Sequence, residues 1–178
     1  MLFHVMVSIR RGTLNDAELL ANLGKTTFLE AHGHSASPEE INEYVSIKFS
    51  TTAFETELKD PDAIFYIMAF NNEVVGYSKL ICNAPHANIT LQQAAKLERL
   101  YILQAFHGLK LGYQLLQHNI NEALNHNQTG MWLFVWTENH KAINFYKNIG
   151  FNIVGRHDFQ ITATRYNPNH QMLLTFKN

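Results

Sequence analysis

The chain contains 178 residues, 46% of them hydrophobic, which is enough for one domain with a buried core. Lys+Arg (14) nearly balance Asp+Glu (15), so the formal net charge of -1 excludes a global attraction to nucleic acid or to anionic membranes. A single cysteine, Cys82, excludes an intramolecular disulfide, and no apolar run approaches the roughly 20 residues of a membrane span. We therefore expect residues 1–178 to form one soluble cytoplasmic domain without nucleic-acid or membrane partners.

The first half of the chain alternates strand and helix patterns, with no linker, repeat or low-complexity tract. Thr13 and Asp16 have the spacing of a capping box ahead of a helical apolar periodicity. Ser37-Pro38 predicts a second helix start, and Asn71-Asn72 predicts a tight turn because asparagine tolerates positive φ. In chain order, the expected elements are a strand at 5–10, a helix at 13–31, a helix from 38, a short helix at 52–59, and a hairpin of strands 63–70 and 73–82.

The second half of the chain predicts a parallel strand pair. Met131–Trp136 has too little polarity to be half exposed, so we expect a buried strand. It follows the strand at 96–103 through a helix, and such a crossover makes two strands parallel, so the sheet is mixed. The expected elements are the strand Lys96–Leu103, a helix with the apolar stripe Leu111, Leu115, Leu116, Ile120 and Leu124, the strand Met131–Trp136, a helix from Thr137–Asn139 to a left-handed cap at Gly150, and the strands Phe151–Gln160 and Gln171–Phe176.

Two segments carry functional signals, and the first is the strand Leu97–Ile102 followed by the run His107–Gly112. The strand passes through a short polar break into a helix, so unpaired N–H groups of the first helical turn gather where the strand ends. These N–H groups and the helix dipole favour an anion such as a phosphate. Taken alone, Gly108 and Gly112 also fit a turn and a helix-packing point.

The second segment is Asn139–Phe151, which reads Asn-x-x-Ala-x-x-Phe-Tyr-x-x-x-Gly-Phe. Together with Leu100–Ile102 and His107–Gly112, it resembles the GCN5-related N-acetyltransferase (GNAT) superfamily, and the resemblance covers most of the chain. The resemblance implies an α/β (α+β) fold, with a mixed central sheet of about seven strands, a V-shaped splay between strands 4 and 5, and four or five flanking helices.

The resemblance further implies acetyl-CoA as the cosubstrate and no metal. The N–H groups at 107–113 would bind the diphosphate, and strand 100–102 would pair with the pantetheine amides. Lys110 stands where the superfamily usually has glycine, so its ammonium would compensate as a phosphate partner. His107 replaces the usual Arg or Gln. Asn139 would contact the pantetheine or sulfur side, and Lys147 the phosphate end. The implied cofactor-binding residues are Leu100, Tyr101, Ile102, His107, Gly108, Leu109, Lys110, Leu111, Gly112, Tyr113, Asn139, Tyr146 and Lys147.

The candidate catalytic residues are Tyr146 and Glu98. A phenol near the leaving sulfur can protonate it, although a tyrosine on an apolar helical face also fits a core position. A backbone N–H near Tyr101 or Ile102 would polarise the thioester carbonyl. Glu98 can remove a proton from the incoming ammonium, directly or through water; the alternative is a structural ion pair with Arg99.

Four stretches resemble bacterial spermine/spermidine acetyltransferases within the superfamily: Phe28–Glu30, Leu97–Ile102, Met131–Asn139 and Val154–Phe159. This resemblance implies a small-molecule amine as the acceptor. A polyamine pocket needs carboxylates, and the first two helices offer Glu30, Glu39, Glu40 and Glu43. A protein N-terminus, an amino acid or an aminoglycoside is an alternative acceptor, and a non-catalytic acetyl-CoA sensor is an alternative function. Dimers are common in similar proteins, so a homodimer is an expected assembly.

Two further patterns favour structural explanations. His32-Gly33-His34 lacks the cysteine or carboxylate cluster of a structural zinc site, so we expect solvated surface there and no metal. No evident base accompanies Cys82 in the sequence, which favours an inert thiol.

Overall fold

The computed structural model describes residues 6–177, which form two compact units. The first unit comprises the chain up to Leu80 together with Arg99–Asn119, and the second comprises Ile81–Glu98 and the chain from Ile120 onward. Strand β4 (Ala94–Ile102) and helix α4 (Leu111–Asn125) are each divided between the units. The single domain expected for residues 1–178 stays a prediction.

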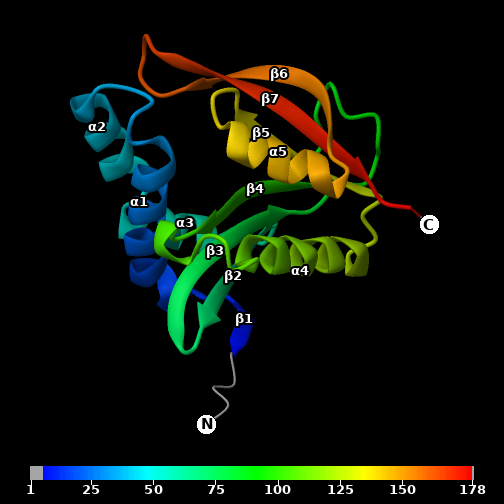
Figure 1. The fold of residues 1–178 in the computed structure, drawn as a ribbon, viewed down its shortest axis with the longest axis horizontal. Coiled ribbons are helices and arrows are strands. Elements are labelled where there is room, and N and C mark those ends of the chain that lie inside the picture. The colour runs from blue at the N-terminus through cyan, green and yellow to red at the C-terminus, as the bar shows by residue number, and fades with distance from the viewer. Residues whose placement is uncertain (1–5, 178) are drawn as a thin grey trace. The chain divides into compact units, whose positions relative to one another are not determined.

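The first unit begins with an antiparallel strand and three helices whose caps follow from the sequence. Asp16 Oδ2 accepts a hydrogen bond from Thr13 N (2.8 Å), and Ser37 Oγ accepts one from Glu40 N (3.3 Å), as the capping pattern predicts. Helices α1 and α3 pack against each other (Figure 1). The elements are β1 (Val7–Arg11), the short 3-10 turn η1 (Leu14–Asp16), α1 (Ala17–His32), α2 (Pro38–Lys48) and α3 (Thr51–Lys59). The part of the predicted first strand at residue 5 lies outside the described residues.

The predicted hairpin of the first unit is confirmed as β2 (Ala63–Phe70) and β3 (Glu73–Ile81). The turn residues Asn71 and Asn72 have φ of 50° and 69°, which is the left-handed conformation that a two-residue hairpin turn requires. Strand β1 pairs antiparallel with β2. Buried aromatic and aliphatic side chains from the helices and the hairpin form the core of this unit; its fully buried members include Leu20, Ile41, Phe54, Phe65 and Tyr77.

The second unit contains β5 (Gly130–Trp136), α5 (His140–Ile149), β6 (Asn152–Gln160) and β7 (Tyr166–Thr175). Strands β6 and β7 form a long antiparallel pair, and β7 also pairs antiparallel with β5 (Figure 1). The predicted start of the last strand at Gln171 is wrong by five residues, since β7 begins at Tyr166. The ladder with β5 ends at Asn169. Pro168 lies opposite Asp158 of β6, and although it has no N–H to donate, its carbonyl accepts from Thr137 N at 3.0 Å.

Hydrogen bonding links seven strands within residues 6–177, in the order β1-β2-β3-β4-β5-β7-β6, and five α-helices accompany them. The expected mixed sheet is therefore confirmed. The β4–β5 ladder is parallel and runs from the pair Ala94–Gly130 to the pair Lys96–Trp132. Strand β4 continues to Ile102 after the last of these pairs. None of the described helices has the length and apolar character to cross a membrane.

Helix α4 corrects the predicted apolar stripe. Leu111, Leu115 and Leu116 are buried as expected, but Leu124 is 46% exposed. The next buried positions after Leu116 are Asn119, which is polar, and Ala123, whereas the predicted Ile120 is only partly buried. In the first unit, the Asn119 amide donates to Ser78 Oγ (2.8 Å) and to Leu115 O (2.7 Å). These bonds satisfy a buried amide, so a polar residue occupies a core position that periodicity assigns to an apolar one.

Candidate functional site

The loop after β4 in the first unit is held at its start by two side chains. The 3-10 turn η2 (Gln104–Phe106) follows the strand, and Glu30 Oε2 accepts a hydrogen bond from Gln104 N at 2.8 Å. His107 Nε2 lies 2.9 Å from Ile102 O. The imidazole therefore links the loop to the end of the strand that precedes it. The sequence predicts a place for His107 in the phosphate loop, but it does not predict this contact with Ile102 O.

Two residues of this loop have left-handed backbones. Gly108 has φ of 87°, and a Cβ added there would meet nothing within 4 Å, so the conformation rather than lack of space favours glycine. Lys110 has φ of 59°, although it carries a side chain. An L-residue pays roughly 1–2 kcal/mol for that conformation. This backbone explains why a glycine suits position 110.

Helix α4 starts directly after Lys110, whose carbonyl accepts the first helical bond from Gln114 N at 3.1 Å. The N–H groups of the first turn have no partner within a helix, and here they belong to Leu111, Gly112 and Tyr113. Residues 107–110 are exposed, as is Tyr113. The two segments predicted to bind the cofactor, Leu100–Ile102 and 107–113, both belong to the first unit. The second of them brings main-chain donors together at the start of a helix.

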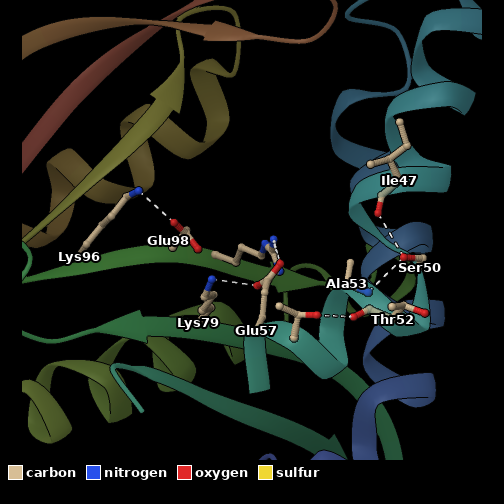
Figure 2. Close-up of polar contacts among 10 residues, drawn as sticks. Ile47, Ser50, Thr52, Ala53, Glu57, Lys79, Lys96 and Glu98 are labelled. Atoms are coloured by element: carbon tan, nitrogen blue, oxygen red, sulfur yellow. Dashed lines mark hydrogen bonds and ion pairs between the residues drawn. The ribbon is translucent and has the colours of Figure 1, made fainter. Parts of the chain in front are cut away.

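An ion-pair cluster fixes the second half of β4 in the first unit. Glu57 of α3 accepts two hydrogen bonds from the Arg99 guanidinium, both at 2.9 Å. Its carboxylate also pairs with Lys79 Nζ at 2.8 Å (Figure 2). A bidentate pair holds the arginine in one orientation, and Arg99 directly precedes Leu100–Ile102. The sequence contains no signal for Glu57, because 42 residues separate it from Arg99.

Tyr101 is anchored inside the first unit by aromatic contacts. Its ring lies 5.8 Å from the ring of Tyr77 and 6.3 Å from the imidazole of His32. Burial raises the pKa of Tyr101 to about 12, so the phenol is neutral at physiological pH. The Tyr101 side chain thus contributes to the core. The role predicted for this residue, polarising the thioester carbonyl, requires only its backbone N–H.

The second unit holds Glu98, which pairs with Lys96 at 3.0 Å on the same strand (Figure 2). The Lys96 ammonium also lies over the rings of Trp132 (5.3 Å) and Phe134 (5.6 Å). Glu98 thus has a structural partner in Lys96, as Arg99 has in Glu57 within the first unit. The role of Glu98 as a base stays a prediction.

Helix α5 of the second unit carries the remaining predicted residues. Asn139 Oδ1 accepts from Ala142 N at 3.1 Å and caps the helix. Tyr146 is 9% exposed, and its ring contacts those of Phe145 (5.1 Å) and Phe151 (5.4 Å). Lys147 is exposed in the last turn.

The helix ends as predicted. Gly150 adopts the left-handed conformation with φ of 112°. Phe151 N then donates to Tyr146 O at 3.1 Å, so the cap fixes the backbone of the candidate acid.

The histidine pair of the first unit is His32 and His34, and the two side chains differ in burial. Burial, with a smaller contribution from His34, lowers the pKa of His32 to about 4, and the His32 ring packs 5.0 Å from that of Phe28. Across residues 6–177, no group of three or more His, Cys, Asp or Glu side chains is placed to hold a metal. The prediction of solvated surface is wrong for His32, which is partly buried.

Comparisons with known proteins agree on one family. The model of the acetyltransferase (GNAT) family matches residues 25–151. An uncharacterized N-acetyltransferase of Mycobacterium bovis is 28% identical over 154 residues, covering 86% of this chain and 94% of the relative. One from Lactobacillus delbrueckii subsp. lactis is 26% identical over 143 residues, covering 80% and 83%. Among solved structures, the PaiA N-acetyltransferase of Thermoplasma acidophilum in complex with coenzyme A matches with a TM-score of 0.74 and 20% identity, over 96% of this chain and 99% of that one, which shows a shared fold.

Proposed function

Because the chain belongs to the acetyltransferase (GNAT) family, which uses acetyl-CoA, we propose that it acetylates a primary amine by direct attack within a ternary complex. The observation that carries this proposal is the run 107–113, in which the exposed residues 107–110, two of them left-handed, precede the main-chain N–H groups at the start of α4. Such donors and the helix dipole suit the diphosphate of CoA. The Lys110 ammonium adds a positive charge beside them.

We assign the chemistry to groups within each unit. The neutral amine attacks the thioester carbonyl carbon, and a backbone N–H of Tyr101 or Ile102 stabilises the oxyanion that forms. The carbon–sulfur bond then breaks, and the Tyr146 hydroxyl donates its proton to the departing sulfur. Glu98, directly or through water, takes the proton that the amine loses. Asn139 Nδ2 contacts the pantetheine or sulfur side, and Lys147 contacts the phosphate end.

The predicted amine acceptor is a polyamine held by four carboxylates of the first two helices. Of the four carboxylates expected to hold a polyamine, Glu30 accepts a hydrogen bond from Gln104 N (2.8 Å) and Glu40 from Ser37 N (3.0 Å). Both carboxylates thus have structural roles, which weakens the support for a polyamine. Spermidine therefore enters the test as one acceptor beside peptides, amino acids and aminoglycosides. A homodimer and a cytoplasmic location stay predictions from the sequence.

The test measures free thiol released from acetyl-CoA with each amine, for the wild type and for Tyr146→Phe. We expect transfer to at least one amine, and a kcat lower by about 100-fold or more in Tyr146→Phe with the acetyl-CoA dissociation constant unchanged. Tyr166→Phe is the matched control, because Tyr166 is 51% exposed on β7. Binding of acetyl-CoA without transfer to any amine would instead identify a sensor module, and absence of binding would refute both functions.

A further inference from the structure

One face of the strands in the second unit combines aromatic and amide side chains. Residues paired across neighbouring strands share a face, and the register places Lys96 beside Trp132, Phe134 beside Gln171, and Trp136 beside Asn169. Strand β6 is the other neighbour of β7, and there His157 pairs with Asn169 and Phe159 pairs with Asn167, again on the same face. Asn167, Asn169 and Gln171 therefore form a row along β7, which we call the β7 carboxamide row.

Part of this face is closed by ordinary packing. Ala84, Ile89 and Leu91 of the preceding loop pack against Ala94 and Trp132. The indole Nε1 of Trp132 donates to Ala84 O at 2.9 Å. This apolar end of the face needs no ligand, and it contrasts with the amide row farther along β7.

The β7 carboxamide row is buried but incompletely bonded. Asn167, Asn169 and Gln171 are 8%, 9% and 0% exposed. Within the described residues, Asn169 Oδ1 and Gln171 Nε2 have no hydrogen-bond partner. Buried amide groups without partners are unfavourable, and packing alone would place apolar side chains here. The row therefore offers one free acceptor and one free donor on the same strand face.

A ring pair covers the row. The rings of Phe134 and His157 stack at 4.4 Å, although their strands are separated by β7 and hence by about 9.6 Å. Both side chains must therefore lean over β7. His157 is exposed, so it can move aside without unpacking the core.

The spacing of the row matches an extended peptide. Alternate residues on a strand lie about 6.6 Å apart, which is also the repeat at which an extended peptide presents N–H and C=O groups along one edge. The Asn88 amide already binds Gln171 Oε1 at 3.0 Å, which shows that the row pairs with an amide. On this face the Glu98 carboxylate is paired with Lys96, so its charge is already compensated and offers less attraction to a polycation.

We propose that the β7 carboxamide row binds the backbone of an extended peptide acceptor whose free amine is acetylated. Asn169 Oδ1 accepts from a peptide N–H, and Gln171 Nε2 donates to a peptide carbonyl. His157 swings away from Phe134 when the peptide enters. This inference rests on the proposed acetyl transfer and names its acceptor class.

The experiment compares peptides carrying a free N-terminal amine with spermidine, for the wild type, Asn169→Leu and Gln171→Met. We expect the peptides to have the higher kcat/KM in the wild type, and each variant to raise the peptide KM about tenfold. The dissociation constant of acetyl-CoA should stay at the wild-type value in both variants. The melting temperature should stay at the wild-type value in Asn169→Leu, because Asn169 Oδ1 has no partner to lose. Gln171→Met also loses the bond from the Asn88 amide to Oε1, so a slightly lower melting temperature is expected for that variant. His157→Ala removes the cover and should lower the peptide KM.

Tyr166→Phe, on the opposite face of β7, is the control. The inference is overturned if spermidine is the better substrate, or if both row variants keep the wild-type peptide KM. Folded variants are identified by acetyl-CoA binding, so a folding defect is recognised separately. If no amine is acetylated by the wild type, the proposed function itself fails. If the wild type acetylates other amines but no peptide, only the acceptor class fails.

Discussion

Replacing Tyr77 by phenylalanine should stabilise the protein. Tyr77 is fully buried in the core of the first unit, and its hydroxyl has no hydrogen-bond partner among the described residues. Burial raises the pKa of this phenol, so it stays neutral in any ordinary assay. A buried polar group without a partner destabilises the folded state by about 1–3 kcal/mol, and removing the hydroxyl relieves this cost. The same change loses the dispersion contacts of the oxygen, which lowers the stability by less than about 1 kcal/mol. The net expectation is a gain of about 1 kcal/mol.

Urea unfolding and thermal melting measure this gain. For a chain of this size, 1 kcal/mol corresponds to a rise of roughly 2–4 °C in melting temperature. Tyr166→Phe serves as the control and should be neutral, since that side chain is 51% exposed. If Tyr77→Phe lowers the free energy of unfolding by 1 kcal/mol or more, the hydroxyl has a partner and the reasoning is refuted.

Three further predictions concern the backbone and one ion pair. Lys110→Asn should keep the melting temperature, because asparagine tolerates φ of 59°, and should raise the KM for acetyl-CoA about two- to fivefold; an unchanged KM would exclude a phosphate contact. Gly150→Ala should lower the free energy of unfolding in urea by roughly 1–2 kcal/mol, since φ there is 112°; a neutral result would contradict the left-handed cap. The hydrogen bond from Arg10 lowers the pKa of Asp16 from 3.8 to about 2, so its stabilisation is present above about pH 4 and is lost as the pH falls toward 2. Asp16→Asn should flatten that acid dependence in pH-dependent melting, and an unaltered slope would contradict the assignment.

Local signals in the sequence predict most elements of the fold. The capping patterns at Thr13 and Ser37, the Asn71-Asn72 turn and the Gly150 cap depend on a few adjacent residues, and the structure confirms each of them. The strand β7 was harder to predict, because Asn167-Pro168-Asn169 has low strand propensity. Its pairing with β5 and β6 overrides that propensity.

Long-range contacts explain what the sequence does not reveal about the site. The position of Lys110 follows from a motif, but its left-handed backbone requires coordinates. Glu57 reaches Arg99 only through the pairing of α3 with the strands, and no sequence spacing encodes that contact. The β7 carboxamide row likewise becomes visible only when the register places its members on one buried face.

The division of β4 between the two units has a consequence for biosynthesis. Tyr101 and Leu103 pack against the core of the first unit. The ribosome adds these two residues only after it has synthesised Ile81–Glu98, which belongs to the second unit. The N-terminal segment therefore cannot complete its packing until the ribosome has passed through Ile81–Glu98, which belong to the second unit. During that interval apolar surface on the nascent chain stays accessible, so translation speed and chaperone capture will affect the yield of native protein.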